Sequence, residues 1–148
     1  LLRGNRFFDL MDYDKAIATY NQALNEFPSN HEIRAALALT YKQRGDYYRA
    51  VTEYKYLINS NPDNAALHNN LGTVYYRNEQ YDLAIEEYRK AIQLDDNLVA
   101  AYGNLGLVFL KKGNAKEAIP FLRKVFQNEE DMLQYMLLFY NPNHEQTG

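Results

Sequence analysis

A period of 34 residues orders the aromatic and small residues of this chain. Tyrosine recurs at this spacing in two columns, and alanine recurs in a third column at four successive positions. A fourth column is aromatic throughout, and a fifth holds only glycine or alanine. The columns are Tyr13, Tyr47 and Tyr81; Tyr20, Tyr54 and Tyr88; Ala16, Ala50, Ala84 and Ala118; Phe7, Tyr41, Tyr75 and Phe109; and Gly4, Ala38, Gly72 and Gly106. Because five columns share one period, we predict an array of stacked structural repeats.

Each repeat has the pattern of two amphipathic helices joined by a turn. Ile33, Leu37 and Tyr41 follow the spacing of one helical face. Gly45 and Gly113 stand where the end of a helix requires a left-handed residue. The column of glycine or alanine predicts the places where two helices touch, because a larger side chain there would hold the backbones apart.

Several polar residues are predicted to cap these helices. Asp46 and Asn114 directly follow the two turn glycines, as N-caps of second helices. Asn114 and Glu117 also have the spacing of a capping box. Asn64 and Asn97 are predicted to cap the first helices of the repeats that follow them.

The order of residues within the third and fourth repeats resembles that of the tetratricopeptide repeat family, whose unit is a helix–turn–helix of 34 residues. The residues that carry the resemblance are Leu71-Gly72, Tyr75, Ala84, Tyr88 and Ala91, and Tyr102, Leu105-Gly106, Phe109 and Ala118. The resemblance covers about residues 1–132 and implies an all-α fold, an α-solenoid of stacked repeats in a right-handed superhelix.

The repeat frame predicts a single domain over residues 1–148 with nine helices. The repeats are 1–30, which is incomplete at its start, 31–64, 65–98 and 99–132. Residues 133–148 are predicted to form a C-terminal capping helix and a short polar tail, because Pro142 ends the helix.

The composition excludes several classes of protein. The chain of 148 residues has no cysteine, so it forms neither disulfides nor Cys-ligated metal clusters. Its net charge of −3 argues against nucleic-acid binding. No apolar run reaches the length of about 18 residues that predicts membrane insertion. The chain begins without methionine or a signal-peptide pattern. We therefore expect a fragment of a longer protein, cytoplasmic by default but of unknown compartment.

The histidines and carboxylates form no catalytic motif. His31-Glu32 begins like the helix of a zinc protease, but Ala35 occupies the place of the second histidine ligand. His68 lies in a column that is aromatic in the next repeat, which predicts a packed ring. Glu86-Glu87 are helix neighbours that point about 100° apart and are predicted to be solvated charges. We expect no enzyme activity, no metal and no cofactor.

In this family a concave groove, lined by the first helices, holds an extended peptide or a partner helix. The resemblance therefore implies a scaffold for protein–protein interaction whose partners are proteins or peptides. The predicted partner-binding residues are Asn5, Leu39, Lys42, Asn69, Asn70, Thr73, Tyr76, Arg77, Asn104, Leu107 and Lys111.

Members of the family that clamp the C-terminal carboxylate of chaperone tails carry cations at certain groove positions. This chain keeps Asn5 and Asn70 from that set, but it has Leu1, Ala100 and Asn104 where the cations belong. Without those cations the charge-assisted hydrogen bonds of such a clamp are lost. We therefore predict that the chain does not bind chaperone tails.

Asn70 and Asn104 occupy the same place in consecutive repeats and are predicted to form a ladder of amides. Such a ladder matches the N–H and C=O groups of an extended peptide. The alternative is that both amides bond only to neighbouring helix backbones or to water. If the ladder holds the main chain of a peptide, the cations Lys42, Arg77 and Lys111 favour a partner segment that mixes acidic and apolar side chains.

Residues 135–140 are apolar on every face of the last helix, although the outer face of a terminal cap is normally polar. One side can dock on the preceding helix pair through Leu122 and Phe126. The other side requires a second molecule, a further domain that is missing from this fragment, or an internal groove. The alternative is that the chain folds back over its own end. The candidate self-association residues are Tyr135, Met136, Leu138, Phe139 and Tyr140. A further alternative is that the chain is the regulatory part of a larger enzyme.

Overall fold

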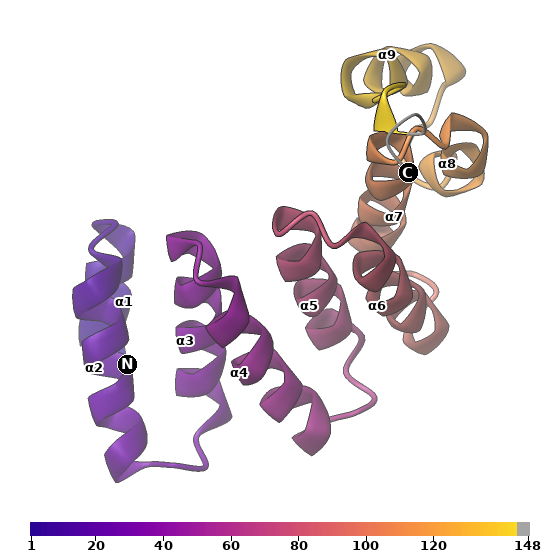
Figure 1. Ribbon diagram of the computed structural model, residues 1–148. Coiled ribbons are helices and arrows are strands. Elements are labelled where there is room, and N and C mark those ends of the chain that lie inside the picture. Colours follow the sequence, from indigo (N-terminus) through magenta and orange to yellow (C-terminus); the bar gives the residue numbers. More distant parts are fainter. Residues whose placement is uncertain (145–148) are drawn as a thin grey trace. The chain divides into compact units, whose positions relative to one another are not determined.

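The structure is a computed structural model, and it describes residues 1–144. Over these residues the chain forms nine α-helices and no strand, so the predicted all-α helical repeat fold is confirmed (Figure 1). The helices are α1 (Leu2–Asp9), α2 (Tyr13–Glu26), α3 (His31–Arg44), α4 (Tyr47–Ser60), α5 (Ala65–Arg77), α6 (Tyr81–Leu94), α7 (Val99–Lys111), α8 (Ala115–Leu122) and α9 (Glu129–Phe139).

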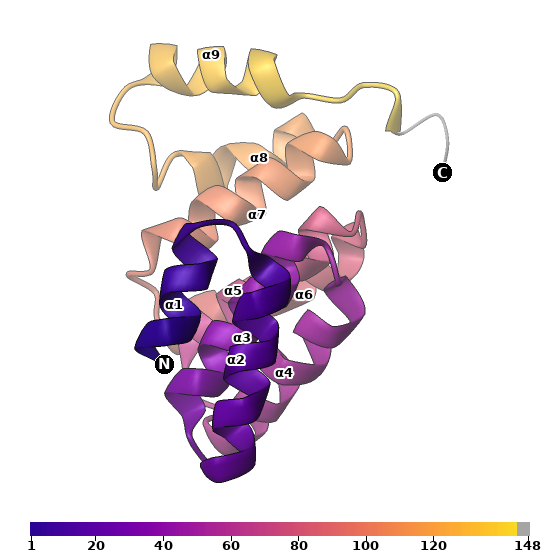
Figure 2. The same ribbon diagram turned by 90° about the vertical axis from the view of Figure 1, so that its left-hand side faces the viewer.

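The helices belong to two compact units. The first unit is Leu1–Asp63 and contains α1 to α4, and the second begins at Asn64 and contains α5 to α9. Within each unit a helix packs mainly on the helices that precede and follow it in the chain. In the second unit α7 also contacts α5 and α9, and α9 lies alongside the α7–α8 pair (Figure 2). The second unit therefore places α5, α7 and α9 next to one another.

Small residues allow the two helices of a repeat to approach closely, as the sequence predicts. A Cβ atom added to Gly72 would lie 2.7 Å from the ring of Tyr88. A Cβ atom added to Gly106 would lie 2.5 Å from the side chain of Leu122, and Gly4 is arranged in the same way. The large side chains that face these glycines are almost completely buried. Each glycine is thus a contact point in the core of its repeat.

The turn inside each repeat contains one residue with positive φ. Gly45 and Gly113 have φ values of 90° and 80°, which confirms the predicted left-handed glycines. The equivalent residues of the first and third repeats are Met11 and Glu79, with φ values of 59° and 60°. A side chain makes this conformation unfavourable, so these two turns are strained where the glycine turns are not.

Two of the predicted N-caps are confirmed. The side chain of Asp46 accepts a hydrogen bond of 3.3 Å from the backbone N–H of Arg49. The side chain of Asn64 accepts one of 3.4 Å from the backbone N–H of Leu67. Each bond satisfies a donor that the first turn of a helix leaves without an intrahelical partner.

Of the other two predicted caps, Asn97 is wrong, and Asn114 is confirmed in its position only. The N-cap of α7 is Leu98, and the backbone N–H of Asn97 instead donates to Asp95 at 3.0 Å. Asn114 is the N-cap of α8, but within the described residues its side chain forms no capping bond, so the capping box with Glu117 is not made. Sequence spacing identifies residues near a helix start, but the side-chain rotamer decides whether the bond forms.

The second helix of the last repeat contains Pro120 and is shorter than its equivalents. The helices α2, α4 and α6 each have 14 residues, whereas α8 has 8 and ends at Leu122. Proline removes a backbone N–H and crowds the preceding turn. The last helix then begins at Glu129, earlier than the boundary expected at residue 133, and the side chain of Asn128 caps it through the N–H of Asp131 at 2.8 Å.

Candidate functional site

The second unit brings most of the predicted partner-binding residues onto one surface of two adjacent helices. This surface, called here the α5–α7 face, carries Asn69, Asn70, Thr73, Tyr76 and Arg77 on α5 and Asn104, Leu107 and Lys111 on α7. Arg77 is exposed, and the other seven side chains are half-buried.

A side-chain hydrogen bond joins the two helices of this face. The Nδ2 atom of Asn104 donates to the Oδ1 atom of Asn69 at 3.0 Å. The predicted ladder, in which Asn70 and Asn104 both offer their amides to a peptide, stays a prediction; the observed bond joins Asn104 to the residue before Asn70. Adjacent helices of a solenoid are tilted and offset, which brings Asn69 rather than its neighbour opposite Asn104.

Two predicted partner-binding residues use their polar atoms inside their own repeats. The Oγ1 atom of Thr73 lies 3.0 Å from the phenol oxygen of Tyr88, and it also donates to the carbonyl of Asn69 at 3.1 Å. The side chain of Asn5 accepts a hydrogen bond from the phenol of Tyr20, the equivalent tyrosine of the first repeat. Both residues therefore satisfy buried tyrosine hydroxyls, a structural role that the sequence reasoning missed.

In the first unit the predicted cation Lys42 is buried, with 8% of its surface exposed. It therefore does not present its charge on an open surface, which corrects its assignment as a partner-binding cation. The other residue assigned on this helix, Leu39, is half-buried.

An aromatic cluster lies at the C-terminal end of the α5–α7 face. The ring of Tyr76 lies 5.8 Å from the ring of Tyr81, between ring centres. Burial raises the pKa of Tyr76 above its usual value, and the nearby phenols of Tyr81 and Tyr135 raise it further. Tyr135 belongs to α9, so the last helix contributes to the electrostatic surroundings of Tyr76.

The inner side of α9 packs on the rest of the unit as expected. Met132 is buried, and the ring of Tyr135 lies 5.2 Å from Phe126 and 4.6 Å from Phe139. The ammonium group of Lys111 lies 5.5 Å from the centre of the Phe139 ring. These contacts place α9 against the end of the α5–α7 face.

The outer side of α9 differs from the predicted self-association set. Of that set, Leu138 and Tyr140 are exposed, at 78% and 40%, whereas Tyr135, Met136 and Phe139 are half-buried against the unit. The most exposed apolar residue of α9 is Leu137, at 84%, and Leu133 is 49% exposed. Leu133 lies outside the predicted apolar segment 135–140, and Leu137 lies inside it but was not among the candidate residues, although their spacing of four residues places them on one helical face.

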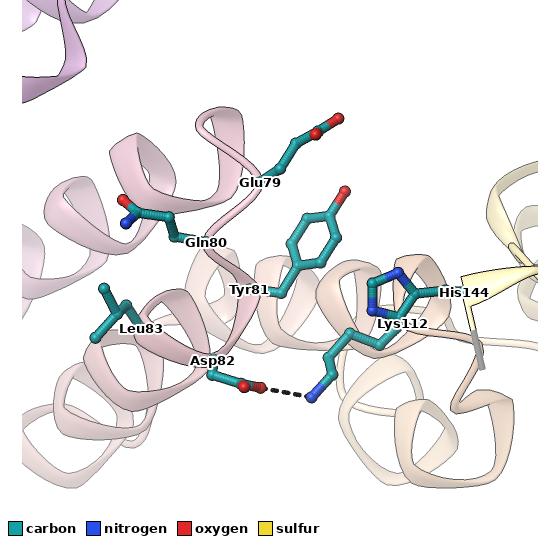
Figure 3. Close-up of a pocket in the computed structure, with 7 residues that line it drawn as sticks. All are labelled: Glu79, Gln80, Tyr81, Asp82, Leu83, Lys112 and His144. Carbon is teal, nitrogen blue, oxygen red and sulfur yellow. Dashed lines mark hydrogen bonds and ion pairs between the residues drawn. The ribbon is translucent and has the colours of Figure 1, made fainter. Parts of the chain in front are cut away.

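After α9 the chain turns back over α7 and the start of α6. It leaves Leu137 and Leu138 exposed, so both alternatives for the outer side of α9 stay predictions. The backbone N–H of Asn141 donates to the carbonyl of Leu110 at 3.0 Å, and the ring of His144 packs against Tyr81 at 5.6 Å. The rings of Tyr81 and His144 stand beside the side chain of Lys112, which extends to Asp82 (Figure 3).

These residues line a pocket of about 360 Å³. Its lining residues are Glu79, Gln80, Tyr81, Asp82, Leu83, Lys112 and His144. The hydrogen bond from Lys112, together with its charge, lowers the pKa of Asp82, so this carboxylate stays ionised. Sequence reasoning missed the pocket because its residues come from three distant segments.

A buried polar pair, His68 and Glu87, lies between α5 and α6. The Nδ1 atom of His68 is 2.8 Å from the Oε2 atom of Glu87, and Lys90 also contacts Glu87 at 3.2 Å. The packed ring predicted at His68 is confirmed, but the prediction that Glu87 is solvated is wrong, because it is 9% exposed. The equivalent positions of the preceding repeat hold Arg34 and Glu53, which are 2.7 Å apart. The pair is thus a recurrent link between two helices.

Within residues 1–144, no group of three or more His, Asp or Glu side chains is arranged to hold a metal ion. In the same part of the chain, no helix combines the length and the apolar character needed to cross a bilayer.

Family comparison identifies the repeats along nearly the whole chain. The profile of the TPR repeat matches residues 4–44, 39–79 and 74–113, and a second profile, the tetratricopeptide repeat, matches residues 99–131. No curated protein matches the chain significantly.

Comparison with solved structures gives the same fold. A crystal structure of MamA is 26% identical, with a TM-score of 0.75, and the match covers 88% of this chain and 77% of that one. The structure of residues 41 to the end of MamA from Desulfovibrio magneticus RS-1 is 23% identical, with a TM-score of 0.77 over 86% of this chain and 72% of that one. MamA MSR-1 is 21% identical, with a TM-score of 0.71, and the match covers 89% of this chain and 74% of that one.

Proposed function

Since this chain belongs to the tetratricopeptide repeat family, and is therefore a scaffold for protein–protein interaction, we propose that it holds an extended segment of a partner protein on the α5–α7 face. The observation that carries the proposal is the bond between Asn104 and Asn69, which fixes two half-exposed amides side by side.

The amide pair suits the main chain of a partner. The bond between the two side chains uses one N–H of Asn104 and the oxygen of Asn69. The pair also carries the NH₂ group of Asn69 and the carbonyl of Asn104, a donor and an acceptor on neighbouring helices. An extended peptide offers the complementary groups at every residue, so this contact is independent of its sequence.

Side chains around the amides favour a partner segment with both acidic and apolar residues. Leu107 is a half-buried apolar contact on α7. Arg77 and Lys111 occupy the same place at the ends of α5 and α7, and each brings a positive charge to the face. Because cations form the strongest hydrogen bonds with carboxylates, acidic side chains suit this end of the face.

Selection from a random peptide library on the full chain tests the proposal. We expect enriched peptides to combine acidic and apolar residues. Asn69→Ala and Asn104→Ala should each weaken their binding by about 2- to 13-fold, which corresponds to about 0.5–1.5 kcal/mol per hydrogen bond. Gln93→Ala, on the exposed surface of α6, is the control and should leave affinity unchanged. If the enriched peptides bind the wild-type chain and the three variants with equal affinity, the binding site lies elsewhere.

The outer side of α9 supports a second candidate function, self-association. Leu137 and Leu138 are among the most exposed large apolar residues of the described chain. Leu137→Glu should then shift a dimer toward monomer in light scattering, whereas Gln134→Glu on the same helix should not. A wild-type chain that is monomeric at high concentration would exclude this candidate.

A further inference from the structure

We propose that residues 139–144 form an intramolecular strap that occupies the end of the α5–α7 face and lifts when a partner binds there. The proposal rests on the function proposed above, because it concerns access to that face. It is carried by three contacts, each from a different part of the strap.

The first contact is to the backbone of α7. The N–H of Asn141 donates to the carbonyl of Leu110 at 3.0 Å, and the same carbonyl accepts a bond of 3.1 Å from Gly113. Carbonyls in the last turn of a helix lack intrahelical partners, so they accept hydrogen bonds from an approaching chain. The strap therefore already occupies a backbone acceptor at the end of the face.

The second contact is to a cation of the face. The Phe139 ring lies 5.5 Å from the ammonium group of Lys111. A ring at this distance attracts a cation through the face of its π system. A partner carboxylate that binds Lys111 has to compete with this ring.

The third contact is to the aromatic cluster. The ring of His144 meets the ring of Tyr81 at an interplanar angle of 68° (Figure 3). Tyr81 in turn packs against Tyr76 of the face. The strap is thus connected to the side chain of Tyr76 through one intervening ring.

A turn within the strap, formed by Asn141, Pro142 and Asn143, stabilises its conformation. The side chain of Asn141 accepts a bond of 3.2 Å from the backbone N–H of Asn143, which closes a turn around Pro142. Proline fixes its φ angle, and an asparagine before the turn stabilises it. The turn directs His144 toward Tyr81 with little loss of conformational freedom. Because the strap is held by a few contacts near the surface, its opening is local and does not require the unit to unfold.

Asn141→Pro is the variant that tests the strap in the full chain. It removes both the N–H that bonds to Leu110 and the side-chain oxygen that closes the turn. Gln134→Ala, on the exposed side of α9, is the matched control.

The first measurement needs no partner. In the NMR spectrum of the wild-type chain, we expect the ring protons of His144 to be shifted by the Tyr81 ring. Asn141→Pro and Tyr81→Leu should return them to random-coil positions, and Gln134→Ala should not. Random-coil positions in the wild-type chain would overturn the strap.

The second measurement uses a fluorescein-labelled peptide enriched from the library. A strap that is closed in about two molecules of three weakens binding about threefold, so Asn141→Pro should tighten it by about this factor. If Asn141→Pro has no effect while Asn104→Ala weakens binding, the strap does not compete and the α5–α7 face stands. If neither variant changes affinity, the peptide binds elsewhere and both proposals are wrong.

Discussion

The phenol of Tyr88 lies 3.0 Å from the hydroxyl of Thr73, so the two helices of the third repeat are hydrogen-bonded beside their closest approach at Gly72. The ring of Tyr88 is 1% exposed. This hydrogen bond satisfies the hydroxyl of Tyr88, so the side chain can be buried without leaving a polar group unpaired.

Burial raises the pKa of Tyr88 to about 12, although the bond from Thr73 acts in the opposite direction. Between pH 10 and 12 the folded chain keeps a proton that the unfolded chain releases. The free energy of unfolding should therefore be unaffected below pH 10 and fall by up to about 2–3 kcal/mol as the pH rises to 12. Urea unfolding at pH 9 and pH 11.5 measures this. Tyr88→Phe should make the decrease smaller, and an equal decrease in both proteins would contradict the assignment.

Gly72→Leu should destabilise the chain by about 1–3 kcal/mol or more, because even a Cβ atom at this position would overlap the ring of Tyr88. Gly103→Ala is the control within a helix of the same unit. A Cβ atom there would lie 3.5 Å from Val125, an ordinary contact. Since alanine favours a helix over glycine, this variant should gain about 0.5–1 kcal/mol. Thermal unfolding that shows the same sign for both variants would refute the packing described here.

Glu79→Gly should stabilise the chain, because Glu79 has a φ of 60° in the turn where two other repeats have glycine. We expect a gain of about 0.5–1 kcal/mol in the free energy of unfolding, as the relief of strain exceeds the entropic cost of glycine. Glu79→Ala removes the same carboxylate without relieving the strain. A similar gain from both variants would show that charge, not conformation, is responsible.

Glu87→Ala should cost about 1–3 kcal/mol, because it removes the buried carboxylate that pairs with the Nδ1 atom of His68. Glu86→Ala is the matched control. Its side chain is 60% exposed and contacts only the same lysine, Lys90, among the ion pairs of the described residues. This variant should change stability by less than about 0.5 kcal/mol. Denaturant unfolding of the two variants checks the difference.

The repeat columns predict most of the fold because each column records a contact that every repeat makes. Gly106 and Leu122 meet as the small and large residues of such a contact. The 34-residue period does not predict features that occur in one repeat only. The short α8, which contains Pro120, and the early start of α9 at Glu129 are two such features.

The candidate site was predicted less completely, for a different reason. Repeat position identifies Asn104 as a surface residue, but its partner depends on the offset between α5 and α7, which no spacing within one helix encodes. The chemical type of Glu87 predicts solvation, whereas its burial depends on His68 across the helix pair. The contact between Tyr81 and His144 joins residues too distant in sequence for any local pattern.

The hydrogen bond between Asn69 and Asn104 is a weak link between α5 and α7 that can lengthen and shorten. Stretching it costs about 0.5–1.5 kcal/mol, only one to three times the thermal energy at room temperature. Apolar interlocking would resist such a displacement far more stiffly. The separation of the two helices is therefore expected to fluctuate around its mean, and a bound partner would narrow that fluctuation. Partner binding would then reduce the fluctuation of the distance between α5 and α7 without changing its mean value.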